Sequence, residues 1–218
     1  MSQTHGKTRW KRFAVVMVPS IAATAAIGVS LAQGALAASF SVSGQQFKVT
    51  AKHLDGYGFA QYGSVVTETG FSPSDTSEGN LKKAHAVAVS TFKTATINKL
   101  CQSVVIKAPF IGDVTLNINA GDNDKKPVTA ENLVIGLDDL KADAKFTGIN
   151  IGVAAGSVSK GNVEDQVRLG APTSFAQEAD RAELDRVSQT AWVTTAGTFT
   201  LNGLHMAVNK GSNPCPDL

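Results

Sequence analysis

Beyond residue 38, hydrophobic side chains recur at every second position in a series of short runs, which is the period of a β-strand. The runs are rich in Val, Ile, Thr and Phe, and they end at Gly, Asn, Asp or Pro. They span residues 39–50, 84–97, 103–106, 114–118, 133–137, 146–153, 191–200 and 201–208. We therefore predict an all-β, single domain of antiparallel strands, with a sandwich-like or an elongated, open architecture. Polar, glycine-containing segments at 120–125 and 202–203 predict hairpin turns.

One segment departs from the strand pattern. Residues 175–186 contain Gln177, Glu178, Ala179, Ala182 and Leu184, which propagate a helix well. We predict at most one short helix in the domain, in this segment. Its acidic and basic residues alternate, which is typical of a solvated charged face. The charged residues of that face are Glu178, Asp180, Arg181, Glu183, Asp185 and Arg186.

A spacing of hydrophobic residues recurs four times, with two residues two positions apart and a third three positions further on. The four sets are Val49, Ala51 and Leu54; Ala95, Ile97 and Leu100; Ile135, Leu137 and Leu140; and Ala182, Leu184 and Val187. Such a spacing predicts a strand that changes face at a polar bulge or turn, so that all three side chains enter one core. At 43% hydrophobic content the short spacing also arises by chance, so the repeat stays a hypothesis. A real repeat favours a stacked or elongated β architecture.

The N-terminal segment has a different pattern. Its basic start is formed by Lys7, Arg9, Lys11 and Arg12. An apolar run over residues 13–31 follows, and then the sequence Ala35-Leu36-Ala37. A basic region, an apolar region and a small-x-small site, in this order, are the layout of a secretory signal peptide. We predict that residues 1–37 are a signal peptide cleaved after Ala37, and that residues 38–218 form an exported, β-rich domain.

An uncleaved anchor is the alternative for the same segment. About 20 apolar residues suffice to cross the hydrocarbon core of a bilayer, so residues 13–31 are long enough. Their many Ala and Gly residues make the run weakly hydrophobic, which favours cleavage. Both interpretations place residues 38–218 outside the cytoplasm, because the basic flank stays inside. The expected location is secreted or at the cell surface, with membrane contact only through the N-terminal segment.

The charge of the chain depends on this segment. The whole sequence has 20 basic and 18 acidic residues, but four of the basic residues precede residue 38. The remaining domain therefore has 16 basic and 18 acidic residues, a net charge of about −2. Nucleic acid attracts proteins with concentrated Lys and Arg, so we exclude it as a partner.

The chain has two cysteines, Cys101 and Cys215. In an exported protein an even number of cysteines indicates a disulfide, and we predict that these two pair. Two separate buried thiols are the alternative. Pro214 and Pro216 flank Cys215 and keep the tail extended, so a bond to Cys101 would fix the C-terminus to the domain. A redox-active pair would be closely spaced, so we predict a structural role.

No catalytic motif is present in the sequence. A hydrolase of the α/β type needs Gly-x-Ser-x-Gly, which does not occur. His53, His85 and His205 have no Cys, His or carboxylate at metal-ligand spacing. Asp138 and Asp139, adjacent on a predicted strand, would point to opposite faces and could not share an acid/base task. We therefore assign no catalytic residue, no cofactor and no metal ligand.

Several longer stretches resemble one known family. They are residues 32–40, 43–49, 100–104, 146–152, 189–192 and 196–199, which together extend over essentially the whole chain. The chain resembles a family of exported actinobacterial proteins found in Streptomyces and its relatives. That family is of unknown function, although some members carry the name cholesterol esterase. The resemblance implies export and both cysteines as family features, and it implies no catalytic residue.

Two functions of different classes remain. The first is a non-enzymatic protein of the cell envelope, or a secreted one, whose β-scaffold binds an apolar ligand such as a lipid, or another envelope component. The alternative is a lipid-ester hydrolase of the sterol-ester type, as the family name suggests, with a Ser and a His that no motif reveals. An apolar cavity in the structure would favour the first, and a nucleophile beside a base would favour the second.

Overall fold

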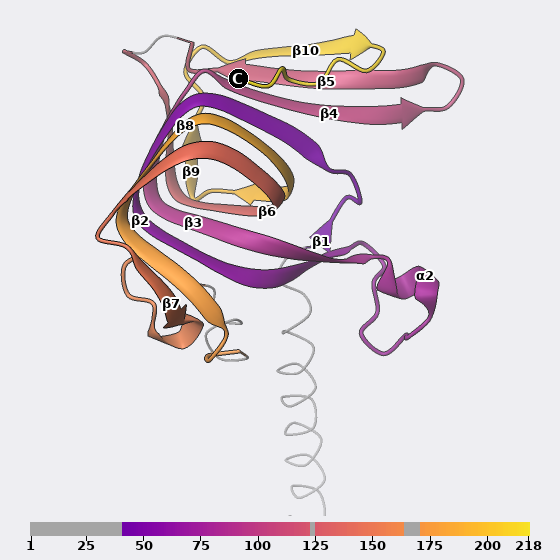
Figure 1. The fold of residues 1–218 in the computed structure, drawn as a ribbon. Coiled ribbons are helices and arrows are strands. Elements are labelled where there is room, and N and C mark those ends of the chain that lie inside the picture. Colours follow the sequence, from indigo (N-terminus) through magenta and orange to yellow (C-terminus); the bar gives the residue numbers. More distant parts are fainter. Residues whose placement is uncertain (1–40, 123–124, 164–170) are drawn as a thin grey trace, which may run out of the picture.

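The computed structural model describes residues 41–122, 125–163 and 171–218 (Figure 1). The predicted signal peptide over residues 1–37, its cleavage site at Ala37 and the apolar run over 13–31 lie outside the described residues. Within the described ranges, no helix has the length and apolar character needed to cross a membrane.

Four long strands form a closed barrel. They are β2 (Phe47–Glu68), β3 (Ala84–Asn98), β6 (Val128–Thr147) and β8 (Phe175–Thr195). β2 pairs antiparallel with β3, β3 with β6, and β6 with β8, and β8 returns to pair with β2. Closure of the ring removes free sheet edges along the paired segments. The predicted single all-β domain is confirmed, and its architecture is a barrel with additional strands.

A three-stranded extension leaves the barrel where β4 pairs with the first residues of β2. It consists of β4 (Leu100–Ala108), β5 (Gly112–Ala120) and β10 (His205–Lys210), and it lies above the barrel in Figure 1. The short elements are β1 (Ser41–Val42), β7 (Asn150–Ala154), β9 (Thr198–Thr200), the helix α2 (Glu78–Leu81) and the 3-10 helix η1 (Ala155–Ser157).

The recurring hydrophobic spacing marks places where the chain changes face. Of its 12 residues, all except Leu140 are buried in one core cluster, and Leu140 packs against that cluster. Ala51 and Leu54 are three positions apart, so they could not share a face of a regular strand. Opposite them on β8 lie Val187 and Leu184, which have the same spacing. The predicted change of face is therefore made by both strands at the same level of the barrel.

The backbone shows how this change is made. Arg186, between Leu184 and Val187, has φ 51°, and Lys99, between Ile97 and Leu100, has φ 50°. A left-handed residue turns the strand and brings the next hydrophobic side chain back to the same side. On β6 the register shifts between Leu137 and Asp139 in the corresponding place. These bends allow strands of 20 residues or more to coil around one interior.

The helix predicted over residues 175–186 is wrong. These residues are the first half of β8, which pairs with β2 on one edge and with β6 or β7 on the other. Ala176, Ala179, Ala182 and Leu184 are buried by neighbouring strands. Burial and pairing on two edges outweigh the small intrinsic preference of Gln, Glu and Ala for a helix. The one α-helix in the described residues is α2.

The two predicted hairpins are also wrong. The segment at 120–125, of which residues 123–124 lie outside the described residues, joins β5 to β6, and these strands do not pair. The segment at 202–203 joins β9, which pairs with β6, to β10, which pairs with β5. Both turns carry the chain between the barrel and the extension. A turn motif specifies a local reversal and not the strand that comes next in the sheet.

The C-terminal tail is fixed to the extension. A disulfide joins Cys101 of β4 to Cys215, as predicted. The backbone N–H of Cys215 donates a hydrogen bond to Ser103 Oγ at 2.9 Å, and that of Asn213 donates to Thr115 Oγ1 at 2.8 Å. Near the end of the chain, Asp217 forms an ion pair with Lys48 at 2.7 Å. The tail therefore covers one face of β4 and β5.

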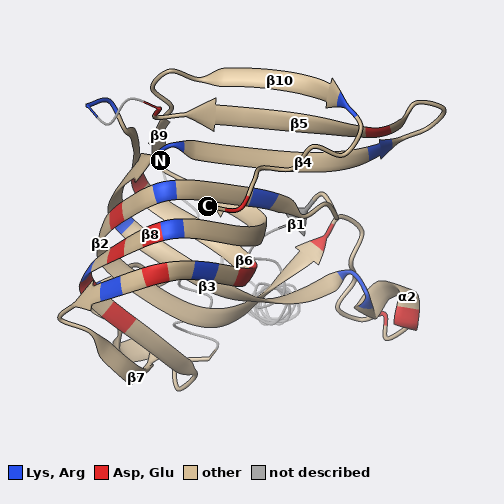
Figure 2. Ribbon diagram, turned by 45° about the horizontal axis from the view of Figure 1, so that its top comes forward, with Lys and Arg blue, Asp and Glu red and all other residues tan. Residues whose placement is uncertain are grey.

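Charged residues lie on the outer wall of the barrel. Figure 2 shows Lys and Arg alternating with Asp and Glu along the curved strands, whereas the extension carries its charges near the strand ends. Arg181 donates hydrogen bonds to both carboxylate oxygens of Asp55, at 2.7 and 2.9 Å. These hydrogen bonds raise the pKa of Arg181 above its ordinary value. The predicted solvated charged face is confirmed for Asp180, Asp185 and Arg186, which are exposed, and it lies on a strand.

Candidate functional site

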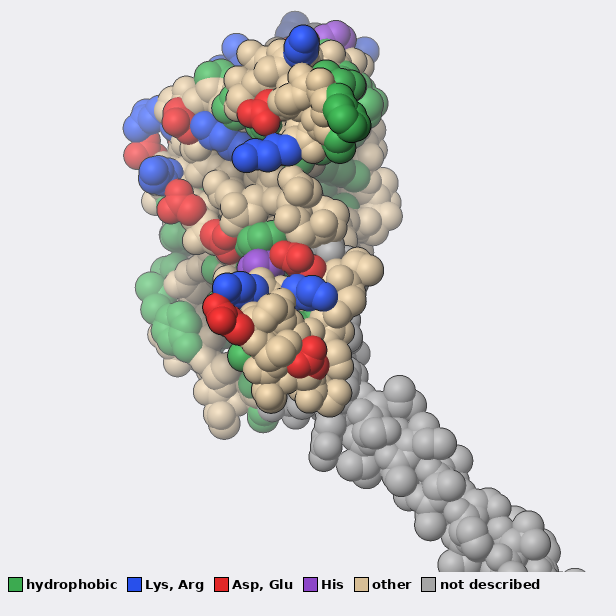
Figure 3. Space-filling model, turned by 90° about the vertical axis from the view of Figure 1, so that its right-hand side faces the viewer, with side chains coloured by type: hydrophobic (Ala, Val, Ile, Leu, Met, Phe, Trp, Pro, Cys, Tyr) green, Lys and Arg blue, Asp and Glu red, His purple; other side chains and the backbone are tan. Residues whose placement is uncertain are grey.

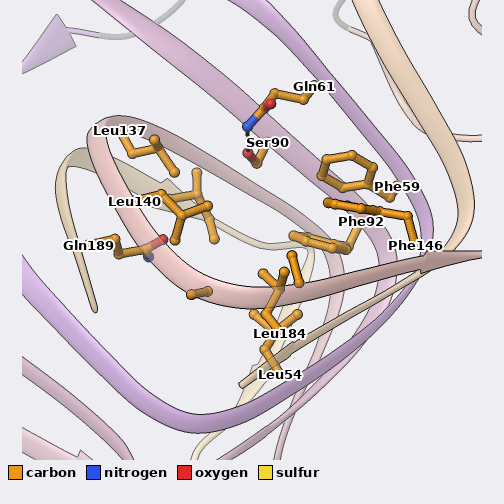
Figure 4. A pocket seen from close by; sticks show the side chains of 13 residues that line it. Leu54, Phe59, Gln61, Ser90, Phe92, Leu137, Leu140, Phe146, Leu184 and Gln189 are labelled. Atoms are coloured by element: carbon orange, nitrogen blue, oxygen red, sulfur yellow. Dashed lines mark hydrogen bonds between the residues drawn. The ribbon is translucent and has the colours of Figure 1, made fainter. Parts of the chain in front are cut away.

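The candidate functional site is a cavity of about 180 Å³ inside the barrel (Figure 4). All four barrel strands contribute to its wall. It is lined by Leu54, Phe59, Gln61, Ser90, Phe92, Ile135, Leu137, Leu140, Ala142, Ala144, Phe146, Leu184 and Gln189. Ten of these 13 residues are hydrophobic and none is charged. We call this space the barrel cavity.

Three phenylalanines form one side of the barrel cavity, as Figure 4 shows. The ring centroid of Phe59 lies 5.4 Å from that of Phe92 and 5.3 Å from that of Phe146, with tilted planes. The sequence leaves space for them at Gly56, where an added Cβ would lie 2.2 Å from the Phe92 ring. Tilted aromatic contacts at this separation are favourable, and the rings give the cavity a rigid apolar wall.

Polar side chains enter the cavity from three strands. Gln61 lies opposite Ser90 on β3 and opposite Gln177 on β8. The Gln61 amide donates to Ser90 Oγ at 2.9 Å, and the Gln177 amide donates to the Gln61 oxygen at 2.5 Å. Gln189, which is 8% exposed, reaches the cavity separately. These uncharged groups can hydrogen-bond a polar atom of a ligand, and the surrounding wall suits an apolar body.

A larger and more open space lies between the barrel and the extension. This outer groove has a volume of about 420 Å³. Its lining comes from β2, β4, β5, β8, β9 and the segments beside β9. It is formed by Phe47, Leu100, Gln102, Ile118, Trp192, Val193, Thr194, Thr195, Ala196, Phe199 and Leu201. Eight of these 11 residues are aliphatic or aromatic, so the groove is apolar as well.

A polar cluster holds Trp192 of the outer groove in place. The indole N–H of Trp192 donates to both carboxylate oxygens of Asp138, at 2.9 Å each, and Gln46 also donates to Asp138. The ring of His85 stacks on the indole at 3.7 Å between centroids, and His85 Nε2 lies 2.9 Å from Glu68 Oε1. The carboxylate of Asp138 therefore contacts the Trp192 end of the stacked rings, and the carboxylate of Glu68 contacts the His85 end. This arrangement fixes the indole orientation at the edge of the groove.

A buried carboxylate anchors the loop that follows β7. Glu178 is 4% exposed and accepts hydrogen bonds from the backbone N–H groups of Ser159 and Lys160, at 2.7 and 2.8 Å, and from Asn150 at 3.0 Å. Burial by itself would raise the pKa of Glu178, but these hydrogen bonds outweigh it and the pKa lies below its ordinary value. The prediction of a solvated Glu178 is therefore wrong, because the loop covers it.

The structure gives the histidines partners that are distant in sequence. His53 Nδ1 lies 2.7 Å from Asp185 Oδ1, and His85 pairs with Glu68. His205 is exposed on β10. Among the described residues, no group of three or more His, Cys, Asp or Glu side chains could hold a metal ion. Asp138 bonds to Trp192, while Asp139 lies 4.0 Å from Lys141, so the two adjacent carboxylates serve separate contacts.

The hydrophobic repeat locates much of the cavity wall, although the sequence does not identify it as a cavity. Five repeat residues line it, and so do Ala144 and Phe146, which lie four and six positions after the last residue of the third set. The five are Leu54, Ile135, Leu137, Leu140 and Leu184. The polar residues Gln61, Ser90 and Gln189 carry no sequence signal that distinguishes them from exposed strand positions. Only their place in the closed barrel shows that they face inward.

The fold and the cavity define a class: a small closed β-barrel with an apolar interior and a sheet extension. The particular family follows from comparison of the sequence with family models. Residues 43–216 match a family of unknown function, DUF6230, and the chain belongs to that family. Comparison with curated proteins finds no similar protein. Comparison with solved structures finds no similar fold.

Proposed function

We propose that the protein is an exported, non-enzymatic β-scaffold that binds an apolar ligand in the barrel cavity. The observation that carries this proposal is the lining of the cavity, with ten hydrophobic residues, three uncharged polar ones and no charge. Cavities of this composition bind apolar bodies and orient them through a few polar groups. A lipid, or the apolar part of another envelope component, is the corresponding ligand class.

Two features support a location outside the cytoplasm. The N-terminal sequence has the basic, apolar and small-x-small order of a signal peptide. The disulfide between Cys101 and Cys215 is of the kind that persists in oxidising compartments and is rare in the cytosol. Whether the host cleaves after Ala37 or retains residues 13–31 as an anchor, the barrel would meet the same extracytoplasmic surroundings.

The residues in the cavity favour binding over ester hydrolysis. A serine nucleophile needs a base within hydrogen-bond reach. Ser90 is the serine of the cavity wall, and its Oγ accepts a hydrogen bond from the Gln61 amide. No histidine or carboxylate is among the lining residues, and His53 and His85 are paired with Asp185 and Glu68. Ser90 therefore has no partner in the cavity that could take its proton.

The test compares two Leu→Trp variants of the full chain. Leu184→Trp fills the barrel cavity, whereas Leu81→Trp adds the same side chain on α2, where Leu81 is 54% exposed. Mass spectrometry of molecules that co-purify should find an apolar ligand in the wild type and in Leu81→Trp, and not in Leu184→Trp. Ester turnover is measured alongside. Turnover that disappears in Ser90→Ala would establish the hydrolase instead, and equal ligand content in all three proteins would refute a site in the cavity.

A further inference from the structure

A third apolar space, of about 30 Å³, has wall residues in common with the barrel cavity and with the outer groove, and we call it the gap. Leu54, Ile135 and Gln189 line both the cavity and the gap. Leu100, Gln102 and Phe199 line both the gap and the groove. The barrel cavity, the gap and the outer groove therefore adjoin one another in this order, from the barrel interior to the base of the extension, and we call this series of spaces the route.

The dimensions of this route restrict what can occupy it. At about 180 Å³ the barrel cavity is close to an apolar cavity of about 150 Å³ that holds benzene. The gap, at about 30 Å³ on the same measure, has room for roughly two or three water molecules. A rigid body of fused rings does not fit into a space of that volume. A flexible hydrocarbon chain is one methylene thick and can bend, so it can follow the route.

We propose that the ligand is a molecule with an unbranched hydrocarbon chain, which fills the barrel cavity and continues through the gap into the outer groove. This inference rests on the proposed function and specifies its ligand class. It excludes a sterol as the ligand, because the fused rings of a sterol exceed the cavity and cannot enter the gap. Trp192 and Phe199 at the groove would contact the part of the chain that leaves the barrel.

The first experiment measures the affinity of the full chain, in the processed form that the expression host yields, for hexanol, decanol, tetradecanol and cholesterol. Each added methylene that enters apolar surroundings should raise affinity roughly fourfold, corresponding to about 0.8 kcal/mol. We expect this increase to continue from hexanol to tetradecanol, and cholesterol not to bind. An affinity that stops rising at hexanol, or binding of cholesterol, overturns the inference and leaves the proposed function intact. Absence of binding by every alkanol refutes the proposed function itself.

A pair of variants tests the route through the gap. Thr194 lines both the gap and the groove, so Thr194→Trp should block passage while leaving the cavity unchanged. Thr198→Trp is the matched control, because Thr198 is an exposed residue of β9 outside all three spaces. We expect Thr194→Trp to bind hexanol with the affinity of the wild type and to bind tetradecanol no more tightly than hexanol. Thr198→Trp should show the same rise in affinity from hexanol to tetradecanol as the wild type. An equal rise in affinity in both variants would overturn the route.

A labelling measurement does not depend on the folding of any variant. A tetradecanol with a photoreactive diazirine at the chain end is cross-linked to the wild-type protein, and a second probe carries the diazirine beside the hydroxyl. Together the two probes should label residues of the barrel cavity and, in the groove, Trp192 or Phe199, with the labelled residue identified in each peptide. Labels from both probes that are confined to residues of the cavity would contradict the continuous route.

Discussion

Cys101 and Cys215 are 114 positions apart in the chain, and their Cα atoms lie 6.0 Å apart across a disulfide. Cys101 is in β4, the strand that connects the extension to β2, and Cys215 is 1% exposed in the tail that follows β10. The loop closed by the bond contains two of the four barrel strands, β6 and β8. The bond therefore links the tail, the extension and the barrel.

Reduction of this disulfide should lower the free energy of unfolding. In the chain-entropy model a loop of about 100 residues contributes roughly 4–5 kcal/mol. Denaturant titration with and without reductant measures the loss in the wild type. In the double variant Cys101→Ala/Cys215→Ala the denaturant midpoint should be as low as that of the reduced wild type, and reductant should not change it. Two free thiols per molecule in the untreated wild type would contradict the bond.

The barrel interior should be sensitive to a single methyl group at Gly56. An added Cβ would lie 2.2 Å from the Phe92 ring, so Gly56→Ala should cost about 1–3 kcal/mol of stability through overpacking. Gly63→Ala, on the same strand, has no atom within 4 Å of its added Cβ and should be nearly neutral. Phe92→Leu combined with Gly56→Ala should cost less than the sum of the two single changes. Additive costs in thermal or chemical unfolding would show that the methyl group and the ring do not conflict.

Stability should depend on pH through Glu178. Its pKa is lower in the folded protein than the ordinary value of 4.5, so the folded state favours the carboxylate. The resulting stabilisation is complete above pH 4.5 and is lost as the pH falls through the folded pKa. Glu178→Gln should destabilise the protein at neutral pH by about 1–3 kcal/mol and should flatten this part of the acid dependence. Glu78→Gln, which removes an exposed ion pair with Lys82, should leave the acid profile unchanged.

The change of face between β3 and β4 should favour glycine at residue 99. Lys99 is exposed and has φ 50°, and its backbone N–H donates to the oxygen of Gly121 at 2.9 Å. Lys99→Gly should be neutral or stabilising by up to about 1 kcal/mol, because glycine adopts this conformation without steric cost. Lys99→Val should destabilise by about 1–2 kcal/mol, since a β-branched residue is strained there. Unfolding midpoints of the three proteins check the order, and equal midpoints would contradict a left-handed residue at this position.

The local pattern of the sequence located parts of most strands and several of the bends, but it missed residues 51–68 of β2 and the first half of β8. Alternation with a period of two depends only on neighbouring residues, so a strand can be recognised without knowing which strand it pairs with. The same holds for the step of three between Ala51 and Leu54 or between Leu184 and Val187, because two side chains of one core can be three positions apart only where the strand changes face. The pairing of the two cysteines likewise followed from a count, and the expectation of export rests on short motifs at the N-terminus.

Tertiary structure decided what the strands enclose. Residues 175–186 have a helical preference, but β2 pairs with one edge of this segment and β7 and β6 pair with the other, which holds it in a strand. The turn at 202–203 reverses the chain, yet it leads from the barrel to the extension because β10 finds its partner in β5. The cavity exists because β8 returns to β2, which turns Gln61, Ser90 and Gln189 inward. Strand pairing depends on contacts across more than 100 positions, and a pattern that is read over a few residues contains no information about them.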